Sequence, residues 1–193
     1  MARYPQNTFV DLIERDVIRI DGERHLLRYV LTLDNMESES EKTVTVIHLH
    51  PMGAEQQYSD AMTNQMVRFL SKEDFQSISF VTLFPYHVPT ATQLRELIVD
   101  PRLEEVMEKN RRFIHERLMN SDVFVLAWGD RPYYIPNRQF DEAFQYVMHL
   151  IQMWQKEKNV YVFRYSHAPS FTKNGQPDTP QKKVIEGILP IHT

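Results

Sequence analysis

The sequence predicts a single α/β domain over residues 1–193, folded as a three-layer α/β/α sandwich. We expect a mostly parallel central sheet of about four strands, extended at one edge by an N-terminal antiparallel hairpin. Three observations predict this class. Short β-branched and aromatic segments alternate with helical segments after residue 42, an Asp-Gly dipeptide separates two apolar runs before it, and no repeat or long linker divides the chain.

The hairpin is the first predicted element. The apolar runs DVIRI (16–20) and HLLRYVLTL (25–33) flank Asp21-Gly22, a dipeptide that tolerates the positive φ angles of a tight turn. We therefore expect an antiparallel pair within residues 17–33, followed by a polar surface connection at 35–42.

The segments after this connection predict parallel strands joined by helices. The strands are TVTVIHLH (43–50), SISFVTLF (77–84), DVFVLAWG (122–129) and NVYVFRYS (159–166). Between them lie three apolar stripes with helical spacing, which we interpret as core: Met62, Met66, Phe69 and Leu70; Leu103, Val106, Met107, Ile114 and Leu118; Phe140, Phe144, Val147, Ile151 and Trp154.

The composition of the chain excludes several classes of functional site. The chain has 22 Lys and Arg against 26 Asp and Glu, a net charge of −4, which argues against general coating of nucleic acid but not against a local basic face. The absence of cysteine excludes disulfides, thiolate zinc, iron–sulfur clusters and a Cys nucleophile. Neither GxGxxG nor GxxxxGK[ST] occurs. We expect no cofactor. The charged N-terminus and the lack of a long apolar run predict a cytoplasmic protein without a membrane segment.

Polar loops follow the four predicted parallel strands, and ligands bind at the carboxyl ends of such strands. These loops span residues 50–60, 85–93, 129–137 and 166–180, and they combine Pro and Gly with Tyr, His, Asn, Gln and Asp. Pro and Gly fix loop shape, while the polar side chains supply hydrogen bonds and proton transfer. The sequence therefore predicts a polar pocket at this edge of the sheet.

The first loop carries the candidate catalytic residues. His48 and His50 alternate along a strand and face the same side, and Glu55 and Asp60 follow. His50, Glu55 and Asp60 suit general acid–base chemistry. Two imidazoles and a carboxylate also suit a metal, but no further ligand spacing completes the set, so we assign no metal. The structural alternatives are that His48 is a hydrogen-bonded core residue and that Asp60 caps the following helix.

The other loops supply candidate ligand-binding residues: Tyr86, Trp128, Gly129, Asp130, Asn174 and Gln176. Trp128 and Tyr86 are suited to stacking on a base, and Gly129 permits close approach of the backbone to a ligand. Packing of Trp128 over the core, a surface ion pair between Asp130 and Arg131, and an exposed Asn-Gly turn at 174–175 are the alternatives. Lys109, Arg111 and Arg112 form a solvated helix face or, alternatively, a phosphate clamp.

The ordered set of motifs resembles the bacterial and phage family catalogued as domain of unknown function 1643. That family's Arg-Leu-Leu-Arg-like strand is matched by RHLLRYVLT (24–32), and its N-P-S-x-A-D loop with the following helix by residues 50–70. The resemblance continues through VTLFPYHVPTAT (81–92), Asp100-Pro101 with Asn110, Ala127-Trp128-Gly129 and TKNGQPDTP (172–180).

The chain departs from the family pattern at several of these positions. His50 stands for the family Asn, Met52 for Ser and Thr82 for the Asn of N-L-F, and the final His-Pro-Leu is reduced to Asp178-Thr179-Pro180. If those positions are catalytic, the activity of this protein is altered or lost. The layout also looks like the uracil-DNA glycosylase superfamily, with a Pro-containing first loop and a Trp-Gly strand end, which is an analogy of fold.

Three functions compete. In the first, the protein is an enzyme acting on a nucleobase, nucleoside or nucleic acid: Asp60 or Glu55 positions water, His50 acts as acid or electrostatic partner, and Trp128 or Tyr86 stacks on the base. In the second, the same loops form a non-catalytic module that binds a nucleotide-like ligand or a protein partner. The third is a metal hydrolase built on His48, His50 and a carboxylate. The sequence leaves the oligomeric state open.

Overall fold

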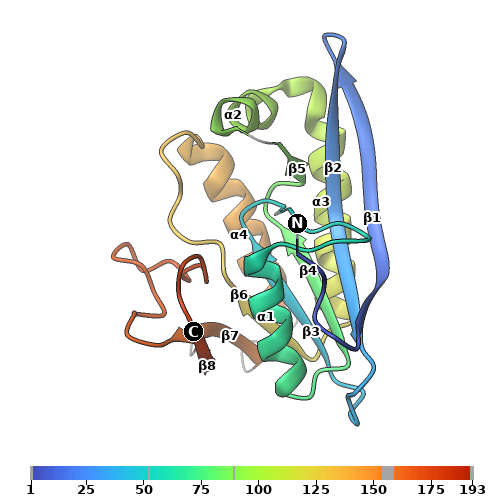
Figure 1. Cartoon of the computed structure of the whole chain (residues 1–193). Helices are drawn as coiled ribbons and strands as arrows, with labels where there is room; N and C mark the ends of the chain where they lie inside the picture. The colour runs from blue at the N-terminus through green and yellow to red at the C-terminus, as the bar shows by residue number, and fades with distance from the viewer. Residues whose placement is uncertain (1, 52, 89, 154–158, 192–193) are drawn as a thin grey trace.

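The fold is an open, mixed β-sheet with helices packed on both faces (Figure 1). The computed structural model describes residues 2–51, 53–88, 90–153 and 159–191. The helix residue Trp154 and the loop residue Met52, both singled out above, lie outside this part of the chain.

The sheet has eight strands, in the order β1-β2-β4-β3-β6-β7-β8 with β5 paired to β2. They are β1 (Thr8–Ile20), β2 (Glu23–Asn35), β3 (Thr43–His48), β4 (Ser77–Thr82), β5 (Tyr86–His87), β6 (Val123–Leu126), β7 (Val160–Tyr165) and β8 (Ile185–Pro190).

The α/β class and the four parallel strands are confirmed, whereas the description of the sheet as mostly parallel is only partly matched. β4, β3, β6 and β7 are parallel neighbours. Antiparallel contacts join β1 to β2, β2 to β4, β2 to β5 and β7 to β8, so the sheet as a whole is mixed. The reason is that both flanks of the parallel core are built by strands that return through turns and loops, and only helical crossovers generate parallel neighbours.

The N-terminal hairpin forms as predicted but is longer. Asp21 and Gly22 both have positive φ, of 50° and 88°, which is the combination that a two-residue hairpin turn of type I′ requires. Pairing runs back to Thr8 opposite Asn35, beyond the predicted residues 17–33. The hairpin forms one edge of the sheet, at the right of Figure 1.

The helices are α1 (Ala61–Lys72), α2 (Ala91–Val99), α3 (Glu104–Met119) and α4 (Asn137–Met153), with a short 3₁₀ turn at Pro101–Leu103. Helix α1 buries Met66 and Leu70 on one face of the sheet, and α3 and α4 bury Leu118 and Val147 on the other. The apolar stripes are therefore core in the described residues, as predicted. Helix α2 has no counterpart in the prediction. Within the described residues, no helix has the length and hydrophobicity needed to span a bilayer.

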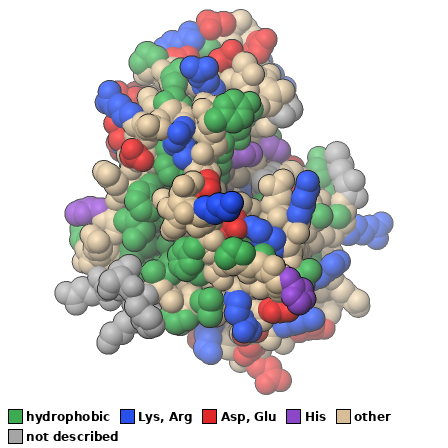
Figure 2. All heavy atoms as spheres, turned by 90° about the vertical axis from the view of Figure 1, so that its left-hand side faces the viewer, with side chains coloured by type: hydrophobic (Ala, Val, Ile, Leu, Met, Phe, Trp, Pro, Cys, Tyr) green, Lys and Arg blue, Asp and Glu red, His purple; other side chains and the backbone are tan. Residues whose placement is uncertain are grey.

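The topology creates a crevice at the carboxyl ends of β3 and β6. From β3 the chain crosses by α1 on one face to β4, then returns by α3 on the other face to β6, on the opposite side of β3. The loop leaving β3 leads to α1 on one face and the loop leaving β6 leads to α4 on the other, so the two loops diverge. Such a switch point is where open α/β sheets bind ligands. Figure 2 shows the face that carries the loops after β6 and β7, with Lys and Arg side chains across its middle.

Candidate functional site

A pocket of about 230 Å³ lies at this switch point. Its walls come from residues 48–50 at the end of β3 and residues 127–130 at the end of β6. Four of the predicted site residues therefore meet in it: His50, Trp128, Gly129 and Asp130. The remaining wall is formed by Met62, Pro132, Tyr134, Thr179 and Gln181.

His50 is the titratable residue of the pocket whose environment best suits proton transfer. Its Nδ1 lies 3.1 Å from the carbonyl oxygen of Pro51, which can only accept, so Nδ1 carries the proton. Burial lowers the pKa of His50, and this effect outweighs the opposing hydrogen bond to Pro51. At neutral pH the imidazole is therefore uncharged with a lone pair on Nε2, the form that acts as a base.

His48 is a core residue, as the structural alternative held, but its hydrogen bonding is incomplete. Its side chain is buried, and its ring centroid lies 5.5 Å from that of Phe80. Burial lowers the pKa of His48 to about 3. Nδ1 has no hydrogen-bond partner among the described residues. His48 therefore lines the pocket as a neutral ring.

Trp128 packs against the core. It is only 2% exposed, and its ring meets that of Phe144 edge to face at 5.7 Å. The indole Nε1 donates to Gln176 Oε1 at 2.9 Å. The structure thus favours the packing interpretation of Trp128. The predicted residue Gln176 accepts the hydrogen bond of the buried indole donor.

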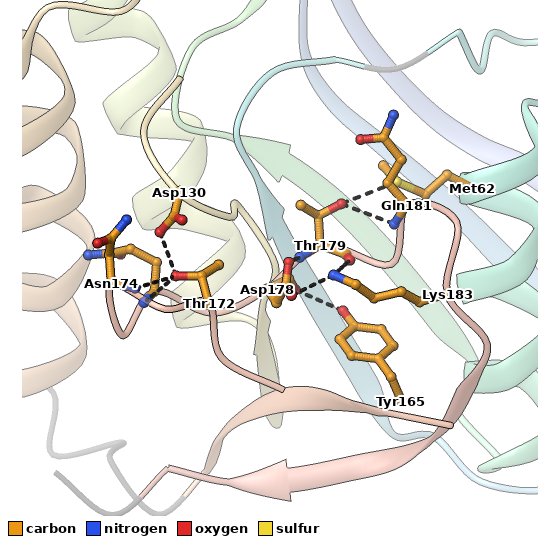
Figure 3. Close-up of polar contacts among 10 residues, drawn as sticks. Met62, Asp130, Tyr165, Thr172, Asn174, Asp178, Thr179, Gln181 and Lys183 are labelled. Carbon is orange, nitrogen blue, oxygen red and sulfur yellow. Dashed lines mark hydrogen bonds and ion pairs between the residues drawn. The ribbon is translucent and has the colours of Figure 1, made fainter. Parts of the chain in front are cut away.

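The loop after β7 closes over the end of β6 (Figure 3). The amide of Gly129 donates to the carbonyl of Pro177 at 2.8 Å, and a Cβ at Gly129 would lie 2.7 Å from Thr179 Cγ2. Thr172 Oγ1 donates to Asp130, so Asp130 is held by this loop. Asn174 is exposed and contacts Thr172 through its backbone amide, outside the residues that line the pocket.

A second group of contacts fixes the pocket wall farther along this loop (Figure 3). Lys183 Nζ lies 2.5 Å from Asp178 Oδ2, and Tyr165 donates its hydroxyl proton to the Asp178 carbonyl at 2.7 Å. The amide of Thr179 donates to Asp178 Oδ1 at 2.8 Å. The amide of Gln181 donates to Thr179 Oγ1 at 3.1 Å, so these bonds together hold Thr179 and Gln181 at the pocket.

Asp60 caps helix α1. Its Oδ1 accepts from the amide of Thr63 at 2.9 Å and its Oδ2 from the Thr63 hydroxyl at 2.7 Å. The capping alternative is confirmed. A catalytic role for Asp60 stays a prediction, and Asp60 is not among the residues that line the pocket.

Glu55 belongs to a partly buried charged cluster with Arg28 and His87, neither of which the sequence singled out. Glu55 Oε1 lies 3.2 Å from His87 Nδ1, and Oε2 lies 3.4 Å from Arg15. Arg28 donates to the Ala54 carbonyl. Burial lowers the pKa of Arg28, and its attraction to Glu55 offsets part of that effect. Burial and Arg28 lower the pKa of His87.

This charged cluster adjoins the pocket through His50. Besides burial, electrostatic repulsion from Arg28, and from His87 when it is protonated, lowers the pKa of His50. One signal for Arg28 was present in the sequence, because an arginine inside the otherwise apolar run LLRYVL needs a partner if the strand is buried on both faces. His87 carried no comparable signal, since a histidine in a Pro-rich loop is ordinary.

Tyr86 and the basic run on α3 lie away from the pocket. Tyr86 is fully buried and lines a separate cavity of about 280 Å³ with Phe84 and Arg138. Lys109 pairs with Asp16 at 2.6 Å and Arg111 with Glu108 at 2.7 Å, as expected for a solvated face. Among the described residues, no group of three or more His, Asp or Glu side chains is arranged to hold a metal ion.

Comparison with solved structures does not assign an enzyme class to this protein. One similar structure is a hetero-hexameric glutamate dehydrogenase from Thermus thermophilus in a leucine-bound form, with 11% identity and a TM-score of 0.35. The match covers 78% of this chain and 33% of that one, and at this TM-score it carries no argument. The likeness to the uracil-DNA glycosylase superfamily is not supported. A search of curated proteins finds no match.

The family comparison agrees with the motifs. The family described as "Protein of unknown function (DUF1643)" matches residues 28–180, from Arg28 of the charged cluster to the end of the closing loop. Since this match spans most of the chain, the protein belongs to the DUF1643 family.

Proposed function

We propose that the protein is an enzyme that binds a nucleobase or nucleoside in the switch-point pocket and uses His50 as a proton-transfer group. The observation that carries the proposal is that His50, neutral because of burial, lines the pocket formed where the β3 and β6 loops diverge.

The pocket's chemistry supports a small planar ligand rich in hydrogen-bonding groups. Asp130 and Gln181 supply a carboxylate and an amide, and Tyr134 supplies an aromatic wall. A volume of about 230 Å³ is below that of most drug-sized sites, which favours a ligand of one or two rings. Recognition of a base requires both edge hydrogen bonds and ring contacts.

The charged cluster supports the assignment of His50 as a base. Arg28 is a buried cation whose field disfavours a second positive charge on His50 and His87. Glu55 Oε1 lies 3.2 Å from His87 Nδ1 and raises the pKa of His87, but burial and Arg28 lower that pKa by more. Both imidazoles are thus poised to accept a proton rather than to donate one.

The test combines a ligand screen with one substitution. Purified protein is incubated with nucleobases, nucleosides and nucleotides, binding is followed by NMR chemical shifts, and products are separated by chromatography. We expect His50→Gln to reduce turnover by about 100-fold to 10,000-fold, the usual contribution of a positioned base, while ligand affinity changes by less than about tenfold. His149→Gln, on the exposed face of α4, is the control. Failure of every compound to bind contradicts the proposal.

A second candidate is a non-catalytic binding module. Two observations favour it. Asp60 is engaged in the α1 cap and Trp128 is packed in the core. Of the predicted catalytic residues, His50 lines the pocket, whereas Asp60 and Glu55 do not. This candidate predicts that the wild type binds the ligand but forms no product. The affinity of His50→Gln for the ligand should then differ from that of the wild type only by the loss of one contact.

A further inference from the structure

Tyr133 is a large aromatic side chain held in solvent beside the pocket. It is 91% exposed, although its two neighbours in the chain, Pro132 and Tyr134, both line the pocket. Its ring stands edge to face against that of Tyr134, with centroids 5.4 Å apart. An exposed ring therefore adjoins the aromatic wall of the pocket.

The loop that carries Tyr133 is fixed. Arg131 Nη1 donates to the carbonyls of Pro132 and Ile135, and the Ile135 amide also donates to Pro132 at 3.0 Å. Ile135 is fully buried and anchors the loop in the core. Tyr133 is exposed because it lies on a turn that these hydrogen bonds fix. The backbone of the loop therefore loses little conformational entropy when a ligand ring covers Tyr133.

We propose that the ligand of this site is a single-stranded nucleic acid, with one base in the pocket and a neighbouring base stacked on Tyr133. This inference rests on the proposed function and names its substrate class. A base in a duplex is paired and stacked on both sides, so it enters a closed pocket only after extrusion, whereas a single strand offers its bases freely. An aromatic platform accepts any base because every base has a π-face.

Basic side chains lie where the sugar-phosphate backbone would run. Arg131 belongs to the Tyr133 loop, and the exposed Lys173 follows Thr172, which donates a hydrogen bond to Asp130 of that loop. Lys182 is exposed next to Gln181 of the pocket wall. Figure 2 shows Lys and Arg side chains in the middle of this face, with some Asp and Glu side chains beside them. Lys173 and Lys182 thus supply exposed positive charge on the loop that borders the pocket, on a chain whose net charge is −4.

The experiment measures binding of a short fluorescein-labelled single-stranded DNA of mixed sequence, and of its RNA counterpart, by fluorescence anisotropy at several salt concentrations. We expect Tyr133→Ala to weaken binding by about fivefold to a hundredfold and Tyr133→Phe to retain it, because stacking needs the ring and not the hydroxyl. Lys173→Gln should weaken binding and reduce the salt slope by about one unit. Phe9→Ala, an exposed aromatic on β1, is the matched control.

Each outcome decides the inference. Equal affinity of Tyr133→Ala and wild type overturns it, and is the result expected if Tyr133 serves a protein partner. Binding of the single strand no tighter than of a mononucleoside also overturns it but leaves the proposed function intact, because His50→Gln still tests that function on the mononucleoside. Absence of binding to any strand or nucleoside removes both.

Discussion

His48 makes the stability of the fold depend on pH. Burial lowers its pKa from 6.5 to about 3, so between these pH values the unfolded chain binds a proton at His48 and the folded chain does not. Stability contributed by the neutral ring is present above about pH 6.5 and is lost as the pH falls toward the folded pKa. We expect His48 to cost about 1.4 kcal/mol of unfolding free energy between about pH 7.5 and pH 5.5, as measured by urea denaturation.

Substitution isolates this contribution. His48→Leu removes the titrating group and the unpartnered Nδ1, so the variant should lose about 1.4 kcal/mol of the pH dependence and keep its stability at high pH. His149→Gln, at an exposed position, should leave the pH dependence unchanged. A pH dependence identical in His48→Leu and wild type would show that folding does not lower the pKa of His48.

Asp60 offers a test that separates capping from catalysis. Asparagine keeps the Oδ1 acceptor for the Thr63 amide, so Asp60→Asn should change the unfolding free energy little, whereas Asp60→Ala should cost about 1 kcal/mol. If Asp60 also positions water, Asp60→Asn lowers turnover of an established substrate with no matching loss of stability. Equal turnover in both proteins would leave capping as the role of Asp60.

Individual site residues differ in how far the sequence predicts them. His50, Gly129 and Asp130 could be found because they follow strands whose β pattern is clear, and strand ends share one edge of a parallel sheet. The contacts of Trp128 and Asp60 required geometry, since an indole at a strand end and an Asp before a helix each suit two environments. Arg28 and His87 meet Glu55 only through the pairing of β2 with β5, which no local pattern encodes.

The loop from β7 to β8 is the element that shapes the pocket, and Gln176 is its link to Trp128. Gln176→Leu leaves the buried indole donor without a partner, which should cost about 1–3 kcal/mol of unfolding free energy. Gln176→Glu keeps an acceptor and should cost less. Faster hydrogen exchange at the Gly129 amide, which bonds Pro177, would report loosening of the loop, while unchanged exchange in Gln176→Leu would show that other contacts hold it.

Elements were predictable where the local pattern was long and regular. The central strands have dense β-branched and aromatic content, and the three predicted helices have sustained apolar stripes. Strand β8 reads IEGILP, with Gly187 inside it and Pro190 at its end, both unfavourable in strands, and it forms because β7 offers an open edge. Helix α2 has only nine residues and β5 only two, too short for periodicity to reveal.

At the scale of the whole molecule, the position of the pocket follows from the order of the strands. Alternation of strands and helices predicts parallel neighbours, but it does not say that β6 returns to the far side of β3. That order makes the β3 and β6 loops diverge, and it places His50 opposite Gly129. It also gives the molecule two cores, one on each face, which share the strands of one sheet.

These shared strands predict that the chain unfolds as one unit. Leu70→Ala opens a cavity under α1 and Leu118→Ala one under α3, in different cores, and each should lower the unfolding free energy by about 2–5 kcal/mol. Because β3, β4 and β6 contribute side chains to both cores, loss of either core removes support from the other. Scanning calorimetry should therefore show a single transition in both variants, shifted to lower temperature, with calorimetric and van't Hoff enthalpies that agree. Two transitions, of which each substitution moves only one, would mean that the two faces of the sheet fold independently.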